Sequence, residues 1–382
     1  MKVLYVITGL ATGGAEMMLF KLLSAMDRKR FTPTVVALSG GEILPRIEAL
    51  DIPVYCMDFQ PGTVPVTGIL RLVDLLRQLQ PDVIQGWMYH GNLAAQIAAF
   101  FLKKKTPVIW NIRGTHTDLG QEKVTTAMAI WLGAKLSRFP AKIINNSKNS
   151  ALLHEQKLGY SSENKVIIPN GFDIELFKPS PDAYNHFRNA LNLPADSLLI
   201  GLIGRYHPMK DHSNFFHAAL QLVKTHPMVR FILAGTEVEP SNRELMNLIS
   251  SLGLEPSVRL LGRRNDIPEI TAALDIASSS SYGEGFSNAI GEAMSCGVPC
   301  VVTDVGDSAW IVGDTGKVVP PRDPTALANA LRELVNMGAV ARRALGERAR
   351  QRVVENFSLE AVVRQYEDLY ESVYQQFKGQ QR

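Results

Sequence analysis

Short apolar runs rich in valine, isoleucine and leucine alternate with helix-forming segments along almost the whole chain. Runs such as residues 3–8, 83–87 and 198–203 are nearly uninterrupted, which is typical of strands buried on both faces of a sheet. Strands that alternate with helices are joined by βαβ crossovers, and such crossovers make neighbouring strands parallel. The alternation therefore predicts an α/β fold built from doubly wound parallel sheets.

The alternation stops once and then starts again, which indicates two domains. Residues 169–181 hold three prolines and a glycine that interrupt regular structure, and a length of 382 residues suits two domains. Because ligands of open parallel sheets bind beyond the carboxyl ends of the strands, we expect two facing Rossmann-like domains with an interdomain cleft. The predicted boundaries are 1–172 and 173–357, and the helix within 358–382 is expected to pack back on the N-terminal domain.

The composition excludes several classes of protein. Apolar residues make up 46% of the chain and charged residues 20%, which is ordinary for a globular protein and not for a disordered one. Three cysteines form no disulfide framework, and the eight histidines are not spaced as metal ligands. The longest apolar stretch, residues 93–102, is half a membrane span, and the first strand is too short for a signal peptide. We therefore expect a cytoplasmic protein.

The charge is divided unevenly along the chain. The net charge of +3 is too small to indicate a nucleic-acid partner. Residues 1–170 contain 19 lysines and arginines against 12 acidic residues, a net charge of +7. Residues 171–382 contain 21 against 25, a net charge of −4. A basic half joined to an acidic half gives a clue to the partners of the protein.

Two glycines follow the first predicted strand. Gly13 and Gly14 precede the first helix, where bare amides let a phosphate approach the helix N-terminus. The spacing is not the G-x-G-x-x-G of dinucleotide-binding proteins, and no acidic residue ends the second strand, so an NAD or FAD site is not expected. By itself the loop is more typical of a tight strand-to-helix turn.

Two cations follow the first strand of the C-terminal domain. Arg205 and Lys210 lie in the loop after residues 198–203. The planar fork of an arginine and the point charge of a lysine together suit a pyrophosphate. Solvated surface cations would show the same pattern, so the loop alone leaves both interpretations open.

Two carboxylates and a helix start follow the strand at residues 276–279. Glu284 and Glu292 are eight residues apart, just over two helical turns, so we expect them to face the same side. Carboxylates accept hydrogen bonds from sugar hydroxyls. The amides of Phe286, Ser287 and Asn288 are expected at the helix N-terminus, which favours an anion. For an isolated pair of glutamates, a role at the helix surface is the simpler explanation.

A histidine lies in the loop after the strand at residues 108–112. His116 stands in the sequence Arg-Gly-Thr-His, where it could hydrogen-bond a substrate. A single histidine in a loop more often has no such role. Its interpretation therefore depends on the other motifs.

Together the four loops resemble family 4 of the glycosyltransferases, which are retaining enzymes of GT-B architecture. The resemblance covers essentially the whole chain, from Gly-Gly-Ala-Glu at residues 13–16 and Pro-Asn-Gly-Phe-Asp at residues 169–173 to the loop at 204–211. The most specific motif has Glu284, seven further residues and Glu292, followed by Ala-Met and Gly-Val-Pro. Trp-Asn-Ile-Arg and the stretch from Arg205 look like the branch that builds bacterial surface polysaccharides.

The resemblance implies a role for each matched residue in the transfer of a sugar from a nucleotide diphosphate sugar, with UDP favoured by the branch. It implies that Arg205 and Lys210 bind the donor pyrophosphate and that Gly13 and Gly14 bind the diphosphate. It implies that Glu292 binds the ribose, Glu284 the transferred sugar and His116 a sugar hydroxyl. It also implies that the amides of Phe286, Ser287 and Asn288 bind sugar and phosphate, and that backbone in the region of Arg263 binds the base.

Two further features of the family bear on this chain. The resemblance implies that no divalent metal or other cofactor is needed, because Arg205 and Lys210 take the place of the metal, and no Asp-x-Asp clamp ends a strand. The chain departs from the family where Val-Gly-Gly-x-x-Glu is usual, since Asp307 replaces a glycine and Trp310 an acid. A donor contact in that loop is therefore in doubt, and packing is the alternative for Trp310.

The basic N-terminal domain fits an acceptor that carries phosphate. In this architecture the first domain receives the acceptor, here expected to be a saccharide or a polyprenyl-diphosphate-linked saccharide. Lysines 103–105 follow an apolar run, and the segment 127–142 combines Trp131 with Lys135, Arg138 and Lys142. Either segment alone is also typical of a core-packed helix with solvated lysines. With a net charge of +7, we expect contact with an anionic membrane surface or a lipid diphosphate.

Three alternatives keep the fold but change the chemistry. A nucleotide-sugar epimerase or hydrolase would act on the donor without an acceptor. A phosphorylase would hold pyridoxal phosphate on a lysine that the sequence does not mark. A nucleotide-sugar-binding protein without activity is the third, although both glutamates and both cations are present.

Overall fold

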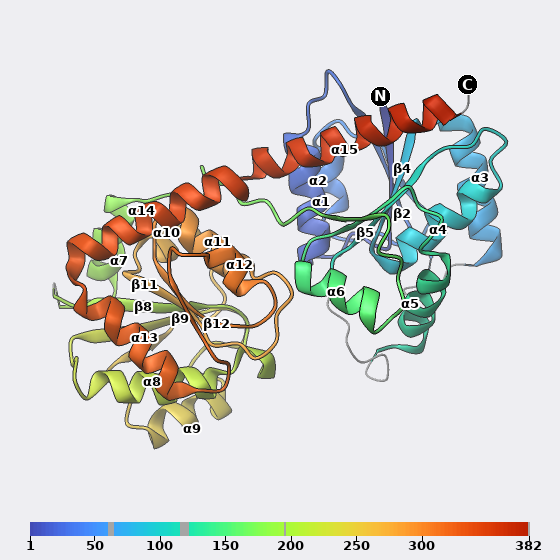
Figure 1. Ribbon diagram of the computed structural model, residues 1–382. Coiled ribbons are helices and arrows are strands. Elements are labelled where there is room, and N and C mark those ends of the chain that lie inside the picture. Colours follow the sequence, from blue (N-terminus) through green and yellow to red (C-terminus); the bar gives the residue numbers. More distant parts are fainter. Residues whose placement is uncertain (60–64, 115–121, 195, 381–382) are drawn as a thin grey trace. The chain divides into compact units, whose positions relative to one another are not determined.

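The chain forms two compact units in a computed structural model that describes residues 1–59, 65–114, 122–194 and 196–380. Unit 1 consists of residues 1–171 together with the C-terminal helix from Leu359, and unit 2 consists of residues 172–358. Each unit is a parallel sheet with helices on both faces (Figure 1). The predicted α/β class with two doubly wound domains is therefore confirmed.

Unit 1 contains a seven-stranded parallel sheet in the order β3-β2-β1-β4-β5-β6-β7. Its strands are β1 (Lys2–Ile7), β2 (Thr32–Ala37), β3 (Val54–Cys56), β4 (Val83–Trp87), β5 (Val108–Ile112), β6 (Lys142–Asn145) and β7 (Lys165–Ile167). Its helices are α1 (Gly14–Ala25), α2 (Leu44–Glu48), α3 (Val66–Leu79), α4 (Met88–Phe100), α5 (Val124–Leu136), α6 (Lys148–Gln156) and α15 (Leu359–Gln380).

Unit 2 contains a six-stranded parallel sheet in the order β10-β9-β8-β11-β12-β13. Its strands are β8 (Leu198–Ile203), β9 (Val229–Ala234), β10 (Val258–Leu260), β11 (Ile276–Ser279), β12 (Cys300–Thr303) and β13 (Lys317–Val319). Its helices are α7 (Pro181–Ala190), the 3₁₀ turn η2 (Pro208–Lys210), α8 (His212–Val223), α9 (Arg243–Ser251), α10 (Ile267–Ala272), α11 (Asn288–Ser295), α12 (Ser308–Val312), α13 (Pro324–Asn336) and α14 (Gly338–Asn356).

Both sheets are apolar on their two faces because helices cover both. In β1, Tyr5 belongs to a core on one face, whereas Leu4 and Val6 belong to a core on the other. In β8, Leu199 and Ile200 divide in the same way between two cores of unit 2. Side chains that alternate between two apolar layers explain why these strands appear in the sequence as uninterrupted apolar runs.

The strand order of each sheet reverses at one place. β1 pairs with β2 on one side and β4 on the other, and β8 pairs with β9 and β11. The loops that leave the two central strands at such a point turn in opposite directions and leave a crevice at their carboxyl ends. The structure therefore marks the loops after β1 and β4, and after β8 and β11, as the places for ligands.

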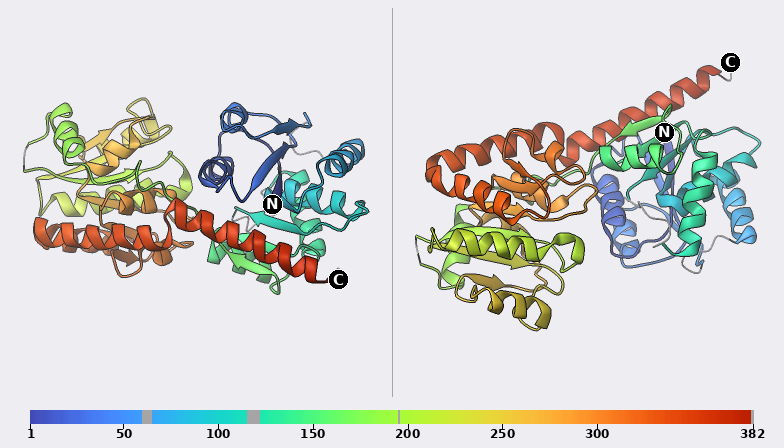
Figure 2. Two further views of the ribbon diagram at one scale, coloured as in Figure 1. Left: turned by 90° about the horizontal axis from the view of Figure 1, so that it is seen from above. Right: turned by 60° about the horizontal axis from the view of Figure 1, so that its bottom comes forward.

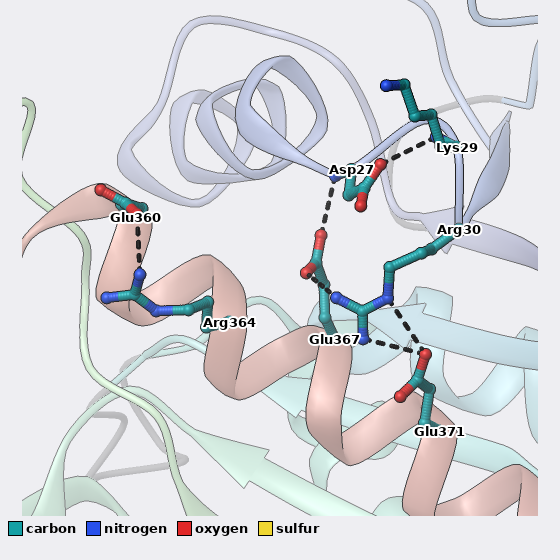
Figure 3. A network of polar contacts seen from close by, with 7 residues as sticks. All are labelled: Asp27, Lys29, Arg30, Glu360, Arg364, Glu367 and Glu371. Atoms are coloured by element: carbon teal, nitrogen blue, oxygen red, sulfur yellow. Dashed lines mark hydrogen bonds and ion pairs between the residues drawn. The ribbon is translucent and has the colours of Figure 1, made fainter.

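The helix α15 is tied into unit 1 by a network of charged groups, shown in Figure 3. Glu367 accepts a hydrogen bond from the amide of Asp27 at 2.8 Å and pairs with Arg30 at 3.1 Å. Arg30 also pairs with Glu371 at 2.9 Å, one turn further along α15. Both views in Figure 2 show α15 as one continuous helix. Its apolar side, which includes Tyr366 and Tyr370, is buried in the same core as β1.

Removal of the Glu367 carboxylate should loosen α15 more than removal of Glu371. The Glu367 side chain is only 5% exposed, and Glu367→Ala leaves the Asp27 amide without its acceptor. We expect the free energy of unfolding of unit 1 to fall by about 2 kcal/mol. Glu371 is 48% exposed, so Glu371→Ala should have a much smaller effect. Urea unfolding of both variants measures the difference, and equal losses would show that burial does not set the strength of this anchor.

Candidate functional site

The loop after β8 presents the two predicted cations in different ways. Arg205 is exposed, and the structure gives its side chain no ion pair within the described residues. Lys210 ends the η2 turn and is half-buried. The next residue, Asp211, has a left-handed backbone with φ of 49° and caps α8 by accepting from the amide of Asn214 at 3.1 Å. This tight turn holds Lys210 at the carboxyl edge of the sheet.

Lys210 and Glu284 form an ion pair across the reversal point of the sheet. The Lys210 ammonium donates to Glu284 Oε1 at 2.5 Å, and Ser281 Oγ donates to the same oxygen at 2.7 Å. Both residues are largely buried, with 24% and 13% of their side chains exposed. The other oxygen, Oε2, has no hydrogen-bond partner among the residues that the structure describes, so it remains able to accept a hydroxyl from a ligand.

The loops after β8 and β11 are also joined through their backbones. Ser280 Oγ donates to the carbonyl of Lys210 at 2.8 Å, and the amide of Tyr282 donates to the carbonyl of Met209 at 2.9 Å. Sequence reasoning missed Ser280 and Ser281. The signal was the run of four serines directly after a buried strand, where side-chain hydroxyls can connect neighbouring loops.

The start of α11 lies beside this ion pair. Ser287 is the N-cap residue and Asn288 begins the helix, so the first amides of α11 point out of its N-terminus and Phe286 lies just before it. A cavity of about 20 Å³, room for one water, is lined by Lys210, Ser281 and Ser287. The Phe286 ring points into the core, where it stacks on Phe172 with 6.0 Å between centroids, so only its backbone faces a ligand.

The helical spacing that predicts a shared side for Glu284 and Glu292 does not apply to the whole segment. The helix begins only at Asn288, so Glu284 lies in the preceding loop and Glu292 is four residues into α11. A spacing of eight residues cannot be converted into an angle when half of it is not helical. The two glutamates belong to consecutive parts of one loop-and-helix segment, and Glu284, not Glu292, makes the contact with Lys210.

Arg263 lies at the edge of this arrangement. It follows β10, the outermost strand, and is exposed. Backbone hydrogen bonds connect its loop to the others: the Gly235 amide donates to the Gly262 carbonyl at 2.9 Å, and the Gly204 amide donates to the Ala234 carbonyl at 2.9 Å. The loops after β8, β9 and β10 thus form one continuous edge, but the Arg263 side chain has no described contact with Lys210 or Glu284.

The loop after β12 packs against the Glu284 segment. Asp307 is buried, and its amide donates to the carbonyl of Gly285 at 3.0 Å. Trp310 packs edge-on against Phe286 and Phe357, with centroid distances of 6.0 Å and 5.3 Å. The Trp310 ring therefore packs against the core, which is the alternative inferred for it from the sequence.

The predicted residues of unit 1 are Gly13, Gly14 and His116. Gly13 is the N-cap of α1 and Gly14 its exposed first residue. A Cβ on Gly13 would lie 2.4 Å from Glu16 Oε2, so the Glu16 side chain folds back over the helix start. Burial raises the pKa of Glu16, against the effect of its own backbone amide and of Arg113. His116 lies outside the described residues.

Arg113, at the carboxyl end of β5, was missed from the sequence although it stands three residues before His116. Its guanidinium donates to the Tyr366 hydroxyl at 3.1 Å and to Asn170 Oδ1. It also lies over the Trp87 ring, 5.1 Å from the centroid. The available signal was a cation directly after a buried strand, the same signal that identified Arg205.

An exposed surface of unit 1 combines apolar and basic residues, and we call it the basic-aromatic surface. Phe100 at the end of α4 packs edge-on against Phe139 after α5, at 5.3 Å, and both are exposed. Along α5 exposed side chains recur at helical spacing, so one stripe of the helix faces outward. The residues of the basic-aromatic surface are Phe100, Phe101, Lys103, Lys104, Val124, Met128, Trp131, Lys135, Arg138 and Phe139. Trp131 is 60% exposed, which excludes the core-packed alternative for it.

None of the helices in residues 1–59, 65–114, 122–194 and 196–380 is long and apolar enough to cross a membrane. Within the same ranges, no three His, Cys, Asp or Glu side chains are grouped to hold a metal ion.

Comparison with family models and relatives assigns both halves of the chain to one kind of enzyme. Residues 12–176 match the family described as Glycosyltransferase Family 4, and residues 197–337 match Glycosyl transferases group 1. EpsF of Bacillus subtilis (strain 168), whose name describes it as a glycosyltransferase, is 32% identical over 79% of this chain and 79% of its own length. The Escherichia coli UDP-Gal:alpha-D-GlcNAc-diphosphoundecaprenol alpha-1,3-galactosyltransferase is 26% identical over 93% of this chain and 96% of its own.

A solved structure shares the whole fold. HepE of Anabaena in complex with UDP has a TM-score of 0.83 and 27% sequence identity, and the match covers 97% of this chain and 100% of that protein. HepE has also been crystallised in complex with UDP-glucose.

Replacement of Gly306 should move the Glu284 loop. Gly306 has φ of +56°, and a Cβ would lie 2.4 Å from the carbonyl oxygen of Glu284. Gly253 has a similar φ of +65° with open space around it, so Gly253→Ala measures the cost of the conformation alone, about 1 kcal/mol. We expect Gly306→Ala to cost more and to raise hydrogen exchange of the amides in residues 280–288. Equal stabilities and unchanged exchange would mean that the loop yields without moving Glu284.

Proposed function

Because the chain belongs to the family 4 glycosyltransferases, we propose that this glycosyltransferase takes a sugar from a nucleotide diphosphate sugar, a UDP-sugar, and transfers it with retention of configuration. The acceptor is a saccharide or a polyprenyl-diphosphate-linked saccharide. The observation that carries the proposal is the Lys210–Glu284 pair at the reversal point of the unit 2 sheet. The binding of UDP by HepE, at 27% identity over nearly the whole chain, supports the choice of nucleotide.

The charges of unit 2 suit the departure of a diphosphate. When the bond between sugar and phosphate breaks, negative charge grows on the leaving oxygen, and cations fixed in advance lower the barrier. Lys210 has three N–H donors and gives one to Glu284, which leaves donors for a phosphate. Arg205 adds a planar fork, and the first amides of α11 add partial positive charge. In this proposal the two side chains replace a divalent metal.

The sugar and the ribose need hydrogen-bond acceptors. Glu284 offers Oε2 to a hydroxyl of the transferred sugar while Lys210 and Ser281 hold Oε1 in place. Glu292 is assigned to the ribose, His116 to a sugar hydroxyl, Gly13 and Gly14 to the diphosphate, and the backbone near Arg263 to the base. Retention requires attack from the face that the diphosphate leaves, and the leaving phosphate then takes the proton of the acceptor hydroxyl.

We assign the acceptor to unit 1 and expect it to be reached from a membrane, on its cytoplasmic side. The named acceptor of the Escherichia coli relative is a diphosphoundecaprenol, which supports a lipid-linked acceptor. The basic-aromatic surface supplies aromatic rings for the interface and lysines for anionic head groups. Exposed apolar groups of this extent on one helix stripe are characteristic of interaction sites.

Lys210→Ala should abolish most of the transfer without unfolding the protein. Loss of one preorganised cation for the leaving group is expected to lower kcat by about 100-fold or more. The matched control is Lys224→Ala, which should retain wild-type activity. Lys224 is an exposed lysine just after the C-terminal end of α8, whereas Lys210 lies just before its N-terminal end. The assay follows UDP release from a panel of UDP-sugars, with and without acceptor.

The same assay separates the alternatives. UDP release that does not depend on an acceptor would contradict a transferase and favour hydrolysis of the donor. Near-normal transfer by Lys210→Ala would contradict the role of Lys210 in binding the leaving diphosphate.

Trp131→Ser should weaken binding to anionic vesicles. A tryptophan that enters the interface contributes on the order of 2 kcal/mol, so we expect the partition coefficient to fall by about 30-fold. The control is Leu176→Ser, which removes an apolar residue of unit 2 with similar exposure. Leu176 is 56% exposed and Trp131 is 60% exposed. Co-sedimentation with vesicles of phosphatidylglycerol and phosphatidylcholine measures both. Wild-type binding that is indifferent to lipid charge and to salt would refute contact through the basic-aromatic surface.

A further inference from the structure

Arg113 carries a positive charge that forms no ion pair with any residue that the structure describes. It follows β5 at the carboxyl edge of the unit 1 sheet and is half-buried. Its two hydrogen bonds go to the Tyr366 hydroxyl and to the amide oxygen of Asn170, and its face rests on the Trp87 ring. All three partners are neutral. In the part of the chain that the structure describes, no carboxylate lies within ion-pair distance of Arg113; Glu16 acts on it only from further away.

The neutral partners of Arg113 are themselves fixed. Tyr366 OH accepts from Asn111 Nδ2 at 2.8 Å, and the Tyr366 ring stacks on Trp87 at 6.2 Å. Asn170 Oδ1 accepts a second hydrogen bond from Asn146 Nδ2 at 3.1 Å. The guanidinium therefore cannot swing toward solvent without breaking contacts with several elements, and it is held in one orientation before any ligand arrives.

The same framework places Arg113 beside the loop that follows β1. Trp87, the last residue of β4, donates from Nε1 to the carbonyl of Ala15 in the first turn of α1 at 3.0 Å. Arg113 lies over that indole ring. The Gly13–Gly14 turn and Arg113 thus flank the reversal point of the unit 1 sheet, where the ligands of such sheets bind.

Partial burial of a charge without a counter-ion is costly, and folding alone gives no reason for it here. A neutral side chain could donate to Tyr366 and Asn170 equally well. Two of the five N–H groups of Arg113 are used by these neutral acceptors, and the remainder of the fork suits the oxygens of a phosphate. The donor of the proposed reaction carries a diphosphate, and so does its acceptor where that acceptor is lipid-linked.

We propose that Arg113 is a substrate-binding residue that holds a phosphate group at the carboxyl edge of unit 1. The inference rests on the proposed function and adds a phosphate contact outside the Arg205 and Lys210 loop. The phosphate belongs either to a diphosphate-linked acceptor or to the donor, and the chemistry of recognition is the same for both. The role is binding, and Tyr366 and Asn170 are the residues that position Arg113.

The test compares Arg113→Met with Arg28→Met. Arg28 is an exposed arginine of the same unit that donates to the Leu50 and Asp51 carbonyls and lies at the opposite edge of the sheet. Two quantities are measured for each variant. One is the affinity for UDP by calorimetry. The other is the ratio of kcat/KM for a saccharide on a short lipid diphosphate to that for the same saccharide as an uncharged alkyl glycoside.

We expect Arg113→Met to change one of the two quantities by about tenfold or more, and Arg28→Met to change neither. A fall in the acceptor ratio with UDP affinity retained assigns the phosphate to the acceptor, whereas a fall in UDP affinity assigns it to the donor. A loss of activity that is equal for charged and uncharged acceptors, with UDP affinity within about threefold of wild type, would overturn the proposal and leave Arg113 as a brace for Tyr366.

A second variant keeps the test decisive if Arg113→Met does not fold. Arg113→Gln retains an N–H donor for Tyr366 and Asn170 but has no charge, and the same two quantities are expected to change in the same way. Tyr366→Phe removes one positioning contact but retains the charge of Arg113, so it should change the affected quantity less than Arg113→Gln does. If the wild-type protein transfers to no acceptor, the proposed function fails, while the UDP measurement still decides the role of Arg113 toward that ligand.

Discussion

Parallel strand pairing is the constraint on which the rest of this structure depends. Every strand in the two sheets pairs in parallel with its neighbours, so all strands of a unit end at the same edge. Where the strand order reverses, between β1 and β4 and between β8 and β11, the following loops diverge. Residues far apart in the sequence, such as Lys210 and Glu284, are thereby brought within hydrogen-bond distance. The ligands of doubly wound sheets bind at such carboxyl edges, and this is where we expect the chemistry of the protein.

Much of this arrangement could be predicted from the sequence, because it depends on local signals. Apolar runs located the strands, and charged residues after buried strands located Arg205, Lys210 and Glu284. What failed depended on where a helix begins or on long-range contact. The expectation that Glu284 and Glu292 face the same side applied helical geometry to residues 284–287, which precede the helix. The pairing of Lys210 with Glu284 spans 74 residues, and no local pattern reports it.

Arg113 and Trp131 are two further residues whose surroundings could not be predicted from the local sequence. The contacts of Arg113 come from β4, the residues after β7 and α15. That these contacts are all with neutral groups is visible only after the chain has folded. The sequence drew attention instead to His116, which lies outside the described residues. Trp131 stands in a helix whose composition is compatible with a core. Only the packing of its neighbours Ala129 and Ile130 inward shows that the indole faces outward.

The two units hold their key cations by different physical means, and this difference has a functional consequence. Lys210 is neutralised by a carboxylate on a neighbouring loop, so a phosphate that binds it competes with or shares Glu284. In the proposed reaction, a diphosphate on Lys210 would therefore act directly on the carboxylate that is assigned to the sugar. Arg113 is held by neutral dipoles and an aromatic face, so an anion that binds it breaks no ion pair. A cation balanced by a carboxylate on a neighbouring loop suits a group whose charge changes during the reaction, whereas a cation fixed by neutral groups suits one whose charge stays constant while it is positioned.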